Sequence, residues 1–265
     1  MPDILADPGS FRELYRARAR GLARLSEQAS ASLTPEVVHD LRVTSRRLQA
    51  MHRLLPKATR ASRESKAFEA AVKDLLKSTS RVRDADTLLK TLETFRDHIP
   101  PSLFDSLHSE RDGTAEEARL SVRRMADARP PRVGASAVDG GRLSKRLGRR
   151  LSRRAHTVQR LLAAALDDES DVARLHELRK EVKKLRYLLE LTGKAPEALS
   201  TLTRWQDSLG AIRDLDVALE FVAPKVAGPA GGIVRELSVK RRSGYASFSK
   251  ASRREAAGVL HSVGV

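Results

Sequence analysis

Two similar stretches decide the fold of this chain: HDLRVTSRRL at residues 39–48 and HELRKEVKKL at residues 176–185. Each begins with a histidine, ends with a leucine and places arginine or lysine at helical intervals. A second pair follows in the same order, VRDAD at 82–86 and IRDLD at 212–216. The first pair is 137 residues apart and the second 130, so the offset changes only by a loop length. Motifs repeated in one order indicate an internal duplication, and we predict two similar units.

Helix-forming residues dominate the sequence, and aromatic residues make up only 4% of it. Helix caps and breakers such as Thr34-Pro35, Pro56 and Gly193 divide the chain into eight segments. We therefore predict an all-α fold of two antiparallel four-helix bundles related by a pseudo-twofold axis. The predicted helices cover residues 11–31, 35–55, 63–97 with a break near Ser80, 102–127, 142–166, 170–193, 196–221 and 233–262.

A segment rich in proline and glycine, residues 129–141, interrupts the helical pattern and predicts a linker. The first four-helix unit is then expected at residues 10–128 and the second at residues 142–262. A further loop is expected at residues 224–232, before the last helix.

The 265-residue chain carries 50 Lys and Arg against 34 Asp and Glu, a formal net charge of +16. This surplus attracts anions and favours nucleic acid, an anionic membrane or another polyanion as a partner. The absence of cysteine excludes disulfides, thiolate catalysis and cysteine zinc sites. The longest apolar run, residues 161–166, is too short to span a bilayer, and the N-terminus lacks the pattern of a signal peptide. We expect a cytoplasmic protein with no membrane partner.

Both histidine-led stretches are amphipathic at helical periodicity. In the first, a cationic face of His39, Arg42, Arg46 and Arg53 lies opposite Val37, Leu41, Leu48 and Leu55. In the second, a cationic face of His176, Arg179, Lys180, Lys183 and Arg186 lies opposite Leu175, Leu178, Val182, Leu185 and Leu189. Like charges four residues apart destabilise a helix, so each face stores repulsion that a bound anion would relieve. The alternative is an ordinary solvent face on a basic protein.

The first helix of each unit adds arginines at intervals of four residues. They are Arg12, Arg16 and Arg20 in the first unit and Arg146, Arg150 and Arg154 in the second. Each set forms a basic stripe, but arginine is so abundant in these helices that a plain solvent face explains the stripe equally well.

The aspartates of the second motif, Asp84 with Asp86 and Asp214 with Asp216, permit two interpretations. They could bind a metal or act as a paired acid and base. Alternatively, they orient the basic residues through charge-assisted hydrogen bonds or cap a helix. Residues i and i+2 diverge on a helix, so a shared metal would require a loop, and we favour the structural role.

The histidines His39 and His176 lead the two basic faces. Neither has a carboxylate or thiol partner at zinc-ligand spacing. A protonated imidazole instead offers positive charge and N–H donors to a phosphate, which is the role that we favour.

At these residues the sequence resembles the CHAD family, the conserved histidine α-helical domain. The resemblance rests on HxxRVxxRRL at 39–48, HxxRxxxKKLRY at 176–187 and the two RDxD segments, and it extends from about Ser10 to Ser262. It implies two four-helix bundles related by a pseudo-twofold and a basic central surface that binds inorganic polyphosphate. Gln49 departs from the pattern, since the family usually has a basic residue there. Many members carry an N-terminal triphosphate-processing domain, whereas this chain is expected to be a stand-alone binding module.

The resemblance also assigns the polyphosphate-binding residues. On the first unit they are His39, Arg42 and Arg46, with Arg47 beside them; on the second they are His176, Arg179 and Lys183, with Lys184 and Arg186 beside them. The arginine stripes add Arg16, Arg20, Arg150 and Arg154 as further candidates.

We expect non-catalytic binding of inorganic polyphosphate by a surface that the two units share, with no cofactor and no metal. Polyphosphate presents dense charge without bases, whereas proteins that bind single-stranded nucleic acid usually add aromatic stacking platforms. The alternatives are a nucleic-acid-binding protein and a magnesium-dependent enzyme that processes polyphosphate. Association with polyphosphate granules follows from the resemblance alone.

Overall fold

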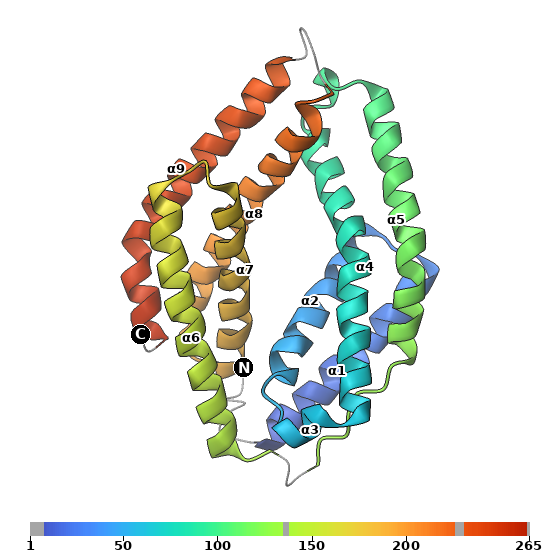
Figure 1. The fold of residues 1–265 in the computed structure, drawn as a ribbon, viewed down its shortest axis with the longest axis vertical. Coiled ribbons are helices and arrows are strands. Elements are labelled where there is room, and N and C mark those ends of the chain that lie inside the picture. The colour runs from blue at the N-terminus through green and yellow to red at the C-terminus, as the bar shows by residue number, and fades with distance from the viewer. Residues whose placement is uncertain (1–7, 135–137, 226–230, 264–265) are drawn as a thin grey trace. The chain divides into compact units, whose positions relative to one another are not determined.

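The computed structural model describes residues 8–134, 138–225 and 231–263, and its regular structure within these ranges is entirely helical (Figure 1). The all-α prediction is therefore confirmed. The long helices are α1 (Pro8–Ala31), α2 (Pro35–His52), α4 (Arg63–Glu93), α5 (Pro101–Asp127), α6 (Gly140–Asp167), α7 (Val172–Leu189), α8 (Pro196–Val222) and α9 (Gly231–Ser262). The short elements are α3 (Lys57–Ala61) and 3-10 turns at Arg96–His98 and Glu190–Thr192.

Most helix ends follow the capping signals in the sequence. The side chain of Thr34 accepts a hydrogen bond from the amide of Val37, which starts α2. Gly193 adopts the left-handed conformation, with a φ of 65°, after the 3-10 turn that follows α7. The predicted break near Ser80 is wrong, because α4 continues through this residue. The Ser80 hydroxyl accepts a hydrogen bond from Arg42 on α2, so its polar group has a tertiary partner.

Mutual contacts divide the chain into two compact units. The first contains the described residues up to Thr87 together with Phe104–Leu147, and the second contains Leu88–Leu103 together with the described residues from Gly148 onward. The last turns of α4 thus belong to the second unit and the start of α6 to the first, unlike the predicted boundaries at 10–128 and 142–262. Residues 135–137 of the predicted linker and 226–230 of the predicted loop lie outside the described residues.

Buried positions keep a common register along corresponding helices. Between α1 and α6 the offset is 136 residues, as in Phe11 with Leu147 and Leu22 with Val158. Between α2 and α7 it is 137: Val38, Leu41, Leu48 and Met51 match Leu175, Leu178, Leu185 and Leu188. Between α5 and α9 it is 130, as in Leu107 with Leu237. Of the apolar face predicted for the first unit, Leu41, Leu48 and Leu55 are buried and Val37 is half-buried, whereas the face predicted for α7 is buried throughout. The shared register supports the internal duplication.

The core of the first unit contains a buried polar contact. The hydroxyl of Tyr15 lies 2.9 Å from Nδ1 of His52, and the hydroxyl of Ser65 lies 3.2 Å from Nε2. Leu151 and Leu189 occupy the positions that correspond to Tyr15 and His52 in the helical register, and both are buried. His52 is therefore an ionisable group at a site where the repeat places a leucine.

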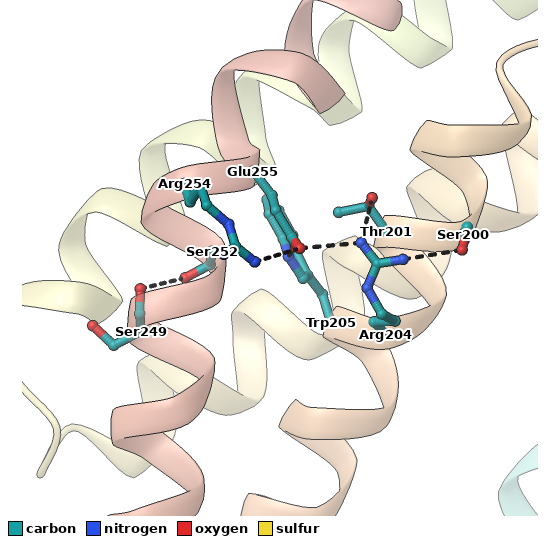
Figure 2. A network of polar contacts seen from close by, with 8 residues as sticks. All are labelled: Ser200, Thr201, Arg204, Trp205, Ser249, Ser252, Arg254 and Glu255. Carbon is teal, nitrogen blue, oxygen red and sulfur yellow. Dashed lines mark hydrogen bonds and ion pairs between the residues drawn. The ribbon is translucent and has the colours of Figure 1, made fainter.

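The core of the second unit contains a different polar contact, shown in Figure 2. The indole nitrogen of Trp205 donates to one carboxylate oxygen of Glu255 at 2.9 Å, and Arg204 donates to the other at 3.1 Å. Burial opposes ionisation, but these two hydrogen bonds hold the pKa of Glu255 below its ordinary value. The corresponding residues in the first unit are Leu75 and Met125, which are buried. Each unit thus joins its helices through polar groups that the other unit replaces with apolar ones.

Replacement of His52 by leucine, the residue that the repeat uses, should make the protein less sensitive to mild acid. Burial lowers the pKa of His52 below its unfolded value of 6.5. The unfolded chain therefore binds more protons at this site as the pH falls, and the free energy of unfolding decreases. Urea unfolding between about pH 8 and pH 6 should give a flatter stability profile for His52→Leu.

The comparison concerns the slope with pH, because the variant also leaves Tyr15 and Ser65 without their shared partner. His176→Gln serves as a reference for the change in slope that another histidine produces, since burial also lowers the pKa of His176. Equal slopes of stability against pH for wild type and His52→Leu would show that His52 does not cause the sensitivity to mild acid.

Candidate functional site

The basic face of α2 contains one exposed histidine and three half-buried arginines. His39 is exposed, and Arg42, Arg46 and Arg47 are half-buried. The guanidinium of Arg42 donates to the carbonyl of Leu76 at 2.7 Å and to the hydroxyl of Thr79 at 3.1 Å, both on α4. Arg42 therefore ties α2 to α4 as well as contributing charge, and its loss would cost stability. Arg46 forms no ion pair with the residues that the structure describes, which makes it the better probe of ligand binding.

The basic face of α7 surrounds His176 with positive charge. Burial lowers the pKa of His176, and four cations lower it further: Arg213, Lys180, Arg179 and Lys183, in decreasing order. Its Nδ1 atom is buried and has no hydrogen-bond partner among the described residues. We name these five residues the His176 cluster. A neutral imidazole inside a group of cations is a site where a bound anion would be stabilised and could be contacted by an N–H donor.

The backbone of α8 contributes to the shape of this cluster. Gly210 on α8 faces the guanidinium of Arg179, and a β-carbon at that position would lie 3.7 Å from its Nε and terminal nitrogen atoms. Arg213 lies one turn further along α8. Although Arg213 belongs to the Arg-Asp-x-Asp motif, the sequence analysis gave a role only to the aspartates and missed this arginine.

Three predicted site residues of the second unit form ion pairs with two glutamates. Glu181 forms 2.6 Å ion pairs with both Arg154 and Lys184. Burial opposes its ionisation, but hydrogen bonds from these two cations lower the pKa of Glu181. Arg186 pairs with Glu190 and donates to the side-chain oxygen of Gln206. The polar face of α7 is therefore mixed in sign, and Arg154, Lys184 and Arg186 are weaker candidates than the His176 cluster.

The arginine stripes of the first helices are not equivalent in the structure. At the 136-residue offset of the buried positions, Arg16 corresponds to Ser152 and Arg20 to His156, so the two stripes share their spacing but not their register. Arg16 and Arg20 are exposed. Arg16 donates to the carbonyl of Val133 at 3.2 Å and thus holds the segment after α5.

The second aspartate of each Arg-Asp-x-Asp motif belongs to a repeated structural contact. In the first unit, Arg111 on α5 donates to Asp86 at 3.0 Å and to the carbonyl of Leu33, between α1 and α2. In the second unit, Arg241 on α9 donates to Asp216 at 2.9 Å and to the carbonyl of Glu169 at 2.6 Å, between α6 and α7. We call each contact an arginine latch.

The latches agree with the structural role favoured for these aspartates. Each joins the third helix, the fourth helix and the first interhelical loop of its repeat. Among the residues that the structure describes, no group of three or more histidine, aspartate or glutamate side chains could hold a metal ion. The sequence analysis missed Arg111 and Arg241, although their separation of 130 residues equals that of the aspartate motifs.

Comparison with known proteins agrees with the observed fold. The family model of the CHAD domain matches residues 14–223, so the chain belongs to the CHAD domain family. A solved structure described as the CHAD domain from the plant Ricinus communis is similar to this chain, with a TM-score of 0.56. The two are 17% identical, and the match covers 96% of this chain and 91% of the plant chain. None of the curated proteins compared with the chain matches it.

Removal of a latch aspartate should destabilise the protein. In Asp216→Asn the buried Arg241 loses its counter-charge, and breaking a buried ion pair costs on the order of 3 kcal/mol. In Asp86→Asn the half-buried Arg111 keeps its pair with Asp112 at 3.6 Å, so the loss should be smaller. Urea unfolding measures this loss, and the exposed neighbour Asp84→Asn serves as the control with a smaller effect. Magnesium should leave the melting temperature of all proteins unchanged. A magnesium-dependent stabilisation that disappears in Asp86→Asn or Asp216→Asn would show that the aspartates bind metal.

Proposed function

We propose that this protein binds inorganic polyphosphate without catalysis, through the basic faces of α2 and α7. The observation that carries the proposal is the His176 cluster, in which four cations lower the pKa of a histidine whose buried Nδ1 atom has no hydrogen-bond partner among the described residues. Like charges repel one another, and a bound polyanion would offset that repulsion. The formal net charge of +16 attracts such a ligand from a distance.

The side chains on the basic faces of α2 and α7 favour a ligand that is recognised through its phosphate groups alone. Arginine, lysine and protonated histidine all donate hydrogen bonds to phosphate oxygens. Aromatic residues make up only 4% of the chain, and proteins that bind single-stranded nucleic acid usually stack bases on aromatic side chains. Membership of the CHAD domain family supports the same choice. A direct competition between polyphosphate and duplex DNA, matched for total phosphate, tests the choice.

The proposed role is binding rather than turnover. A phosphate-processing enzyme of the kind considered for this sequence would use the paired aspartates to hold magnesium. In the structure Asp86 and Asp216 each direct one carboxylate oxygen toward an arginine. No helix in the described part of the chain has the length and apolar character needed to cross a membrane. Recruitment to polyphosphate granules in the cytoplasm fits a binding module and forms part of the proposal.

Charge removal at the binding faces should weaken polyphosphate binding. Arg46→Gln and Lys183→Gln should each lower affinity about tenfold, because a hydrogen bond to a charged group contributes on the order of 1.5 kcal/mol. Lys184→Gln is the matched control, since Lys184 follows Lys183 on the same helix, pairs with Glu181 and lies outside the His176 cluster. Titrations at several salt concentrations should show a steep fall in affinity for wild type and a shallower one for the variants.

A salt-independent affinity in wild type would contradict the electrostatic mechanism. An equal loss in Lys183→Gln and Lys184→Gln would contradict the assignment of the His176 cluster. Circular dichroism must show unchanged helicity in each variant.

Polyphosphate binding should strengthen as the pH falls from about 8 to about 6. In the free protein, burial and the surrounding cations lower the pKa of His176. A bound polyanion places negative charge near the imidazole and raises this pKa, so the complex takes up a proton. Calorimetric titrations in buffers of different ionisation enthalpy measure that uptake directly.

The double variant His39→Gln, His176→Gln retains a hydrogen-bond donor at both sites but cannot ionise there. It should bind less tightly than wild type near pH 6 and take up fewer protons. If its pH profile coincided with that of wild type, the histidines would be structural and binding would depend on arginine and lysine alone.

A further inference from the structure

The outward face of α6 in the second unit carries a row of basic side chains, three arginines and one histidine, outside the basic faces described above. Arg149, Arg153, His156 and Arg160 are exposed, at spacings of four, three and four residues. At about 100° per residue these four side chains lie within about 60° of the helix circumference. With a rise of 1.5 Å per residue, the row is about 16 Å long. The buried residues Leu151, Ala155, Val158 and Leu162 occupy the opposite face.

The row is not balanced by acidic residues. Helix α6 contains no aspartate or glutamate before its last residue, Asp167. None of the four side chains forms an ion pair with the residues that the structure describes. Exposed cations on other helices do form such pairs, as in Arg119 with Glu116 at 2.7 Å on α5 and Lys240 with Glu236 at 3.2 Å on α9. Since mixed charges stabilise a solvent-exposed helix, a row of one sign has a cost that an external anion would offset.

The shape of the row selects among possible anionic partners. Helix α6 contains no aromatic residue, so it offers neither a stacking platform for bases nor an aromatic anchor for a membrane interface. A single row on one straight helix matches a linear ligand with charge along its whole length. A flat membrane would contact a broader surface, and a DNA duplex would be read from within a groove.

We propose that the α6 row is a second contact surface for polyphosphate, used by chains longer than the His176 cluster requires. This inference rests on the proposed function. The additional contacts raise the affinity for long chains, because a tethered segment binds at high effective concentration. Short chains occupy the His176 cluster without reaching the α6 row. The row therefore makes the affinity depend on polyphosphate length.

The test uses the full chain and polyphosphates of about 10 and about 100 phosphates. The triple variant Arg149→Gln, Arg153→Gln, Arg160→Gln should lower affinity for the long chain at least tenfold, and the log–log salt slope should decrease by about 2 for three lost contacts. Affinity for the short chain should remain that of wild type. The matched control Arg235→Gln, Arg242→Gln, Lys250→Gln removes the same charge from exposed positions of α9 and should change neither affinity appreciably.

Four results would overturn the inference while leaving the proposed function intact. An equal loss in the α9 control would mean that net charge alone matters, and an equal loss for both chain lengths would mean that the row belongs to the primary site. A loss for duplex DNA without a loss for polyphosphate would make the row a nucleic-acid surface. If wild type binds neither polyphosphate, the proposed function itself fails. If Lys183→Gln weakens binding but the α6 variant does not, only this inference fails.

Discussion

The arginine latch connects three segments of each repeat at one buried point. Arg111 joins Asp86 to the carbonyl of Leu33, and Arg241 joins Asp216 to the carbonyl of Glu169. A guanidinium that is shielded from solvent requires both a counter-charge and acceptors for its N–H groups. Separation of the three segments would leave the arginine and the aspartate without their partners. The carbonyls belong to the loops just before α2 and α7, which carry the histidine-led faces. The latch thus holds the loop that precedes each basic helix.

Charge in this protein is divided between balanced and unbalanced positions. Glu181 forms ion pairs with both Arg154 and Lys184, whereas His176 and Arg213 lie among further cations. A surplus of positive charge in the sequence therefore does not translate into uniform anion affinity. The candidate site is the place where four cations converge on one imidazole, because a bound anion there would reduce the repulsion between them.

The two units share a buried register but differ in the polar groups inside it. His52 with Tyr15 occupies positions that are leucine in the second repeat, and Trp205 with Glu255 occupies positions that are Leu75 and Met125 in the first. Both kinds of pair fill the space between the helices, since a hydrogen-bonded polar pair and an apolar pair are each compatible with close packing. Only the polar pair introduces an ionisable group, so the units differ in their response to pH.

The helices, their apolar faces and the repeat were predictable from local sequence. Periodicity and caps such as Thr34 act over a few residues, and burial of Leu41 and Leu178 follows directly from them. The partners of individual cations were not predictable, because they depend on which helices lie side by side. The residues in these contacts are at least 27 positions apart: Arg42 donates to Leu76, Arg154 pairs with Glu181, and Arg213 lies near His176. The sequence by itself therefore determined the helical fold and the abundance of positive charge, whereas tertiary packing decided which charges are neutralised, since an ion pair depends on distance in space and not along the chain.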